Sequence, residues 1–132
     1  EIESGGDVAQ MAKISSVIQN RLKAGMQLEM NSTGRYVDSV IKNYINSDDP
    51  DAYGKYDEYY DTFKCPGLPA GPICNPGEEA VKAVISPLNT DYLYFCVGDD
   101  GVYRYAATAE EHRANLIASG LVSEDSETLR LP

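Results

Sequence analysis

Two glutamates stand at the start of the chain, Glu1 and Glu3, directly before the flexible pair Gly5-Gly6. In an extended segment both carboxylates would point the same way, because side chains repeat every two residues, whereas in a helix they would diverge. Neighbouring carboxylates raise each other's pKa, and partial burial adds to this, so one of them can stay protonated as an acid. The pair therefore indicates acid–base chemistry, although Glu-x-Glu is also common on solvated surfaces.

Other catalytic patterns are absent. The sequence holds no Gly-x-Gly-x-x-Gly, P-loop, Gly-x-Ser-x-Gly or His-Glu-x-x-His motif. His112 is the only histidine, so any Ser–His or Cys–His arrangement would need it. Its neighbours Glu110 and Glu111 predict an exposed position on a helix rather than a catalytic base.

The three cysteines are Cys65, Cys74 and Cys96. They predict no metal site, because no Cys-x-x-Cys pair occurs. A local disulfide between Cys65 and Cys74 stays open in an oxidising compartment. Three ordinary buried cysteines are the favoured interpretation.

Length and charge limit the functional classes. With 132 residues the chain is expected to form one domain. Its net charge of −10 argues against nucleic acid or an anionic membrane surface as a partner, because both attract basic proteins. No stretch approaches the roughly 20 apolar residues that span a bilayer. The chain opens without a methionine, so we interpret it as a fragment or mature domain of a longer protein.

The first half of the chain is expected to be mainly helical. Apolar spacing predicts a helix over residues 7–24, with Asp7 as N-cap and Gly25 just past its end. Residues 26–30 alternate weakly and are compatible with a short strand, and 36–45 again show helical spacing. The polar, turn-rich stretch 46–59 predicts a surface loop.

In the second half, four prolines and three glycines make residues 65–77 a structured loop. A short helix is expected over 78–85. Residues 92–97 and 102–106 predict a hairpin around the turn at Asp99-Asp100-Gly101. Thr108 and Glu111 form a capping-box pattern before a helix over 109–119.

Four motifs, in order, carry a resemblance to a known family. They are E-I-E-S (Glu1–Ser4), N-R-L-K-A-G-M-Q-L (Asn20–Leu28), Y-D-T-F with G-L-P-A-G-P-I-C-N-P-G (Tyr60–Gly77), and T-D-Y-L-Y-F (Thr90–Phe95). Together they resemble the YceG-like family of endolytic murein transglycosylases. The resemblance runs to about Leu116.

The resemblance implies an α+β fold of the lysozyme-like or transglycosylase kind, with helices packed around a small antiparallel sheet. It implies a catalytic domain over residues 1–122 and a tail over 123–132. The family's catalytic glutamate is the second one of E-x-E-T, which matches Glu3, and Glu1 then becomes a supporting carboxylate. Glu3 would protonate the bond between MurNAc and GlcNAc and then deprotonate the MurNAc C6 hydroxyl, giving a 1,6-anhydro end without water, metal or organic cofactor.

The resemblance also implies which residues line the glycan groove. Four of the matching positions depart from the family pattern: Glu29 replaces glutamine, Asn31 aspartate, Ser32 proline and Asp61 asparagine. The expected substrate-binding residues are Glu1, Glu29, Asn31, Thr33, Tyr36, Tyr60, Asp61, Thr62, Gly67, Leu68 and Pro69.

The implied partners are peptidoglycan glycan strands, with cell-wall synthesis proteins as further candidates. The implied location is the extracytoplasmic face of the bacterial membrane, where an N-terminal helix outside this chain would anchor the protein. Two other hypotheses stay open: a catalytically weak module that binds peptidoglycan or cell-wall assembly proteins, and a lyase acting on a small metabolite. Nothing in the sequence resembles a pyridoxal phosphate site, which argues against the lyase hypothesis.

Overall fold

The computed structural model describes residues 1–45 and 49–123 and shows an α+β domain, as predicted. Its elements in chain order are helices α1 (Val8–Ala24) and α2 (Asn31–Tyr36), the π-helical segment η1 (Val37–Ile41), helices α3 (Lys42–Ile45), α4 (Pro50–Tyr60) and α5 (Glu78–Ile85), strands β1 (Tyr94–Val97) and β2 (Tyr103–Ala106), and helix α6 (Ala109–Ala118).

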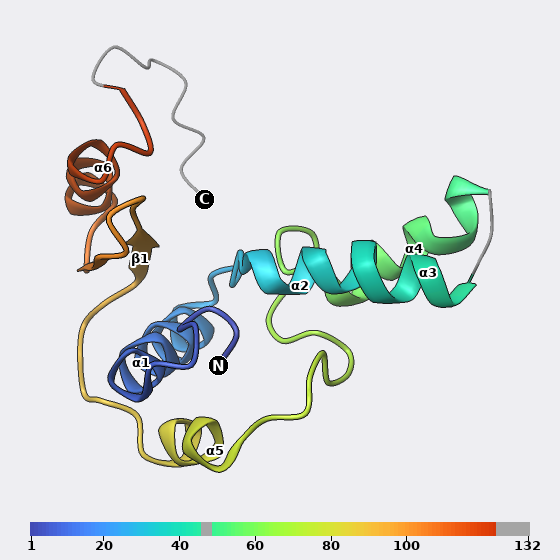
Figure 1. Cartoon of the computed structure of the whole chain (residues 1–132), viewed down its shortest axis with the longest axis horizontal. Helices are drawn as coiled ribbons and strands as arrows, with labels where there is room; N and C mark the ends of the chain where they lie inside the picture. The colour runs from blue at the N-terminus through green and yellow to red at the C-terminus, as the bar shows by residue number, and fades with distance from the viewer. Residues whose placement is uncertain (46–48, 124–132) are drawn as a thin grey trace.

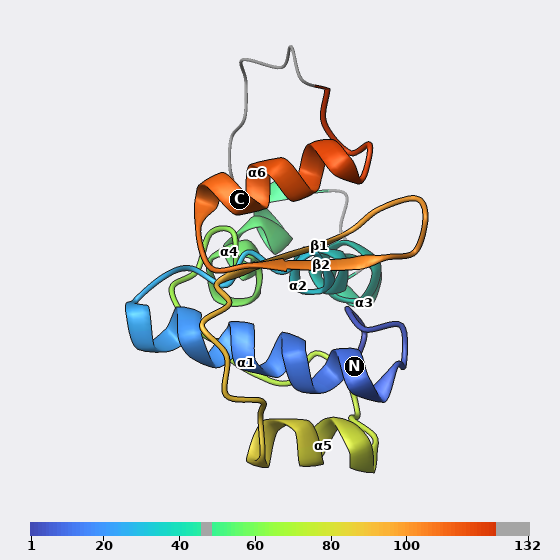
Figure 2. The ribbon, with the colours of Figure 1, turned by 90° about the vertical axis from the view of Figure 1, so that its left-hand side faces the viewer.

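The elements form layers around the hairpin. Strands β1 and β2 are antiparallel, with Tyr94 opposite Ala106 and Val97 opposite Tyr103. Figure 2 shows the hairpin between α6 on one face and α1 on the other, with α5 beyond α1. Helices α2, α3 and α4 extend to one side of these layers (Figure 1). Within the described residues, no helix has the length and apolar content needed to cross a bilayer.

Helix α1 is the central element, and its predicted ends are confirmed. The Asp7 carboxylate accepts a hydrogen bond from the Gln10 N–H (3.0 Å), which satisfies a free donor of the first turn. Gly25 ends the helix with φ 68°, a left-handed conformation that favours glycine. The buried face includes Ile14 and Val17, which pack into the core below the hairpin.

The expected strand over residues 26–30 is absent. Leu28 and Met30 are buried, which explains the alternation, but Glu29 between them has φ 53° and breaks the extended run. The Thr62 carbonyl accepts from the Glu29 N–H and the Thr62 hydroxyl from the Met30 N–H, so this segment pairs with the chain after α4. The following helix begins at Asn31, five residues before the expected start at Tyr36.

The stretch predicted as a loop over residues 46–59 contains helix α4. Asp49 caps it by accepting from the Asp51 N–H (3.0 Å), and Pro50 stands at its first position. Aspartate followed by proline is typical of turns and of helix starts alike, so the prediction of a loop here is wrong. Residues 46–48 lie outside the described residues.

The C-terminal part agrees closely with prediction. The capping box of Thr108 and Glu111 is present at the start of α6, and α5 has the expected bounds. His112, however, is not a surface residue: it is buried at 2% exposure, its ring stacked on that of Tyr94 at 5.1 Å. It shares one helix face with Leu116, also buried, so that face points to the sheet. The expected tail over 123–132 lies outside the described residues except for Ser123.

Candidate active site

The first residues form a turn, neither an extended segment nor a helix. The Ser4 hydroxyl donates to the Glu1 carbonyl (2.8 Å), and the Ser4 N–H donates to the same oxygen (3.2 Å). Ser4 is buried at 2% exposure, so the serine of the E-x-E-S motif stabilises the turn. As a result, the carboxylates of Glu1 and Glu3 have different partners.

Glu3 is half-buried and held from two sides. Its Oε1 accepts a hydrogen bond from the Ser32 N–H at the start of α2 (2.7 Å). The Tyr103 hydroxyl on β2 donates to the Glu3 carbonyl (3.0 Å). The other carboxylate oxygen of Glu3, Oε2, has no hydrogen bond to any described residue and is available to a ligand.

Glu1 has a different position. Its Oε2 accepts from the Gly77 N–H (2.8 Å), at the end of the proline-rich loop and the start of α5. This bond ties the N-terminal turn to the loop that walls one side of the site. The geometry suits the supporting role that the resemblance implies.

Two cavities meet at Glu3. The first has a volume of about 610 Å³, and its polar lining comprises Glu3, Arg21, Glu29, Asn31 and Arg35 with a few others. The second has a volume of about 500 Å³ and a mainly apolar wall from the proline-rich loop, namely Leu68, Pro69, Pro72 and Ile73. A carboxylate between a polar and an apolar hollow suits a ligand with both kinds of surface, such as a sugar ring.

Buried Arg21 and half-buried Glu29 form an ion pair on the wall of the first cavity. Nη1 of Arg21 lies 2.8 Å from Oε2 of Glu29, and the same guanidinium donates to the carbonyls of Gln27, Leu28 and Leu93. Arg21 therefore fixes the segment before α2 and the start of β1 at once. This role was not predicted, although Arg21 continues the buried stripe of Ile14 and Val17.

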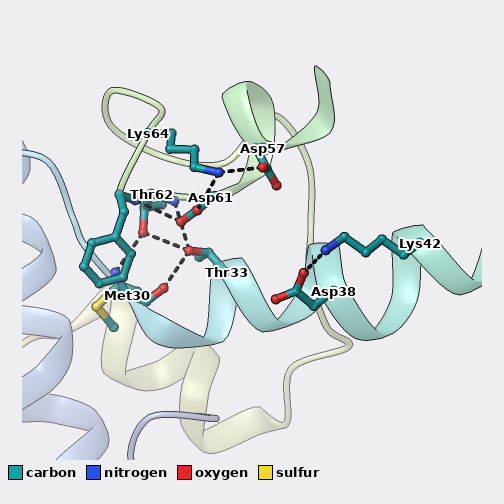
Figure 3. A network of polar contacts seen from close by, with 9 residues as sticks. Met30, Thr33, Asp38, Lys42, Asp57, Asp61, Thr62 and Lys64 are labelled. Atoms are coloured by element: carbon teal, nitrogen blue, oxygen red, sulfur yellow. Dashed lines mark hydrogen bonds and ion pairs between the residues drawn. The ribbon is translucent and has the colours of Figure 1, made fainter. Parts of the chain in front are cut away.

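Two threonines link α2 to the end of α4, as Figure 3 shows. The Thr33 hydroxyl donates to the Met30 carbonyl (2.6 Å), accepts from the Thr62 N–H (3.0 Å) and lies 2.9 Å from the Thr62 hydroxyl. Thr62 is completely buried and lines neither cavity, while Thr33 lines the second. Both threonines therefore hold α2 and the end of α4 together beside the site.

The other predicted groove residues are divided between two places. Leu68 and Pro69 line the second cavity, beside Glu1 and Thr33. Tyr36, Tyr60, Asp61 and Gly67 line neither cavity. The rings of Tyr36 and Tyr60 pack together at 5.5 Å, and Asp61 accepts from the Phe63 N–H (3.1 Å) and contacts Lys64.

All three cysteines are free thiols. Cys65 and Cys96 are buried, as expected, and burial raises the pKa of both thiols. Cys74 is exposed, which corrects the expectation of three buried cysteines. It lies in the proline-rich loop.

His112 is a buried group whose pKa differs from its ordinary value. Burial, with a smaller contribution from the charge of Arg21, lowers its pKa, and its Nδ1 has no hydrogen-bond partner in the described part of the chain. The same residues contain no cluster of three or more His, Cys, Asp or Glu side chains that could bind a metal ion.

Fold and site together define an α+β domain with a single half-buried glutamate where two cavities meet. The chain belongs to the YceG-like family, whose model matches residues 2–117. It is 35% identical over 115 residues to the endolytic murein transglycosylase of Bacillus subtilis (strain 168), and 31% identical over 106 residues to the protein of that name from Streptococcus pneumoniae. These alignments cover 83% and 78% of this chain.

The crystal structure of a yceG-like protein from Listeria monocytogenes shares the fold, with a TM-score of 0.60 and 34% identity over 78% of this chain. The chain spans only a part of these proteins: 29% of the Bacillus protein, 19% of the Streptococcus protein and 32% of the Listeria chain.

Proposed function

We propose that this chain is the catalytic segment of a peptidoglycan lytic transglycosylase. It would cleave the bond between MurNAc and GlcNAc within the glycan strand and leave 1,6-anhydroMurNAc ends. The observation that carries the proposal is the position of Glu3, half-buried where the two cavities meet, with one carboxylate oxygen held and the other unpartnered among the described residues. The names of the relatives support the same activity.

The chemistry needs one carboxyl group used twice. Oε2 of Glu3, when protonated, donates its proton to the bridging oxygen as the C1–O bond of MurNAc breaks. The carboxylate then takes the proton from the C6 hydroxyl of the same sugar, whose oxygen bonds to C1. Because no water enters, a second carboxylate at glycosidase spacing is not required. The nearby carboxylates of Glu1 and Glu29 each already have a partner, Gly77 N–H and Arg21.

The surroundings of Glu3 support a polymer substrate. The apolar wall of Leu68, Pro69 and Pro72 in the second cavity can cover the face of a sugar. Asn31 and Arg35 line the first cavity and offer hydrogen-bond donors there. For the whole protein we propose a place at the extracytoplasmic face of the bacterial membrane, with an anchor outside this chain and glycan strands as the substrate.

The test compares the full-length protein with its Glu3→Gln variant on purified sacculi and on nascent glycan. Mass spectrometry should detect anhydro-ended fragments with the parent, and at least about a hundredfold fewer with Glu3→Gln, because the loss of a general acid–base group costs on the order of 10²–10⁴ in rate. Glu58→Gln is the matched control, since Glu58 is an exposed glutamate on α4 away from both cavities.

Equal product release by Glu3→Gln and the parent would contradict the assignment of the acid. Binding of glycan by the parent without any product would favour the alternative of a peptidoglycan-binding module.

A further inference from the structure

One side chain on the first cavity is a cation without a counter-ion among the residues that the structure describes. Arg35 is exposed, lines the cavity that Glu3 borders, and makes no side-chain hydrogen bond or ion pair within residues 1–45 and 49–123. The other arginine on this cavity, Arg21, is buried and committed to Glu29 and three carbonyls. Arg35 is therefore the cation that a ligand in the cavity can reach.

Asn31 lies on the same side of α2. It is four residues before Arg35, a spacing that puts two side chains next to each other on a helix, and it lines the same cavity. An aspartate at position 31 would neutralise Arg35 through an i,i+4 ion pair. Asparagine leaves the guanidinium free and adds an amide donor beside it.

We propose that Arg35, with Asn31, binds a carboxylate carried by the substrate. This rests on the proposed function, in which the ligand is a murein strand. Every second sugar of such a strand has a lactyl substituent, which ends in a free carboxylate or continues into a stem peptide with carboxylates of its own. A guanidinium matches a carboxylate with two parallel hydrogen bonds.

The overall charge of the chain opposes the binding of an acidic strand. The chain carries a net charge of −10, and Glu3 and Glu29 already line the first cavity. An acidic strand would be repelled by this field, whereas a neutral glycan would not. Arg35 thus offsets part of this repulsion for strands with acidic substituents, and it gives no such gain to neutral strands of the same length.

The test measures binding in a full-length Glu3→Gln background, so that the ligand is not consumed. The ligands are a peptide-bearing glycan oligomer, the same oligomer after amidase has removed its peptides, and a chitooligosaccharide of equal length, which has no carboxylate. Arg35→Gln should weaken binding of an acidic oligomer about two- to fivefold, the upper range of a solvent-accessible ion pair, and leave the neutral oligomer unchanged.

Asn31→Asp should weaken acidic binding in the same way, because the new carboxylate pairs with Arg35 in place of the ligand. Arg113→Gln is the control: it removes the same charge from the exposed side of α6 and should change neither affinity. The difference in acidic binding between the parent and Arg35→Gln should also shrink as salt rises, since the pair is solvent-accessible. An Arg35 effect on the amidase-treated oligomer alone identifies the lactyl carboxylate, and an effect on the peptide-bearing oligomer alone identifies the stem peptide.

Two results would overturn the inference: equal weakening of neutral and acidic ligands by Arg35→Gln, or no weakening of either. The outcome is separate from that of the proposed function, because binding is measured without cleavage. If the parent forms anhydro products but its binding of acidic ligands does not depend on Arg35, only this inference is wrong. An Arg35-dependent preference in a parent that forms no products would remove only the activity.

Discussion

The buried guanidinium of Arg21 allows the sharpest prediction about stability. Arg21→Met keeps a long, flexible side chain but removes all the donors that hold Glu29 and the carbonyls of Gln27, Leu28 and Leu93. Breaking a buried ion pair costs about 3–5 kcal/mol, because the remaining charge stays desolvated. The Glu29 side chain keeps 22% of its exposure, so part of that cost is relieved by solvent.

We therefore expect Arg21→Met to lower the free energy of unfolding by about 3 kcal/mol, which corresponds to a Tm lower by about 10 °C in a domain of this size. Urea and thermal unfolding followed by circular dichroism measure it. Lys23→Met is the control, since Lys23 is an exposed cation on the same helix, and it should change the free energy of unfolding by no more than about 0.5 kcal/mol. Arg21→Met within about 1 kcal/mol of the parent would refute the reasoning, because such a residue could not hold three segments together.

Three further predictions concern other parts of the domain. Burial lowers the pKa of His112 from 6.5, so the unfolded chain binds the proton at a higher pH than the folded chain does. The free energy of unfolding should therefore fall as pH drops below about 6.5 and stay constant just above it. Urea titrations at pH 7.5 and 5.5 should show this decrease in the parent and not in His112→Phe. Gly98→Ala should destabilise the domain by about 1–3 kcal/mol in urea unfolding, because its Cβ would lie 2.8 Å from the Ser119 Cβ; a neutral result would mean that α6 shifts freely. Gly54→Ala, inside α4 with nothing within 4 Å, should raise the Tm through a gain of about 0.5–1 kcal/mol, and a decrease would contradict the helical assignment there.

The elements with explicit end signals could be predicted from the sequence. Asp7 and Gly25 mark the ends of α1, and Thr108 with Glu111 marks the start of α6, because capping is a local interaction that a short pattern encodes. Helix α4 was missed since its polar and acidic residues are typical of loops. Its stability comes from packing against η1 and α2, which no local pattern shows.

The site was predictable only in part. The spacing of Glu1 and Glu3 indicated acid–base chemistry, but the choice of Glu3 depended on the resemblance. The burial of His112 had a signal in its spacing with Leu116, which the acidic neighbours outweighed. The donor to Glu3 is a backbone N–H, and the positive φ of Glu29 is a backbone property too, so residue types alone could not reveal either.

The hydrogen bond from the Ser32 N–H to Glu3 limits which residues position 32 can accept. Every residue except proline has the main-chain hydrogen that makes this bond, while the burial of Ser32 limits the size of the side chain at this position. Proline fits the first turn of a helix but has no such hydrogen. Ser32→Pro would thus preserve the helix while untying the glutamate, which makes this single position a natural place to separate how the acid is oriented from how the domain folds.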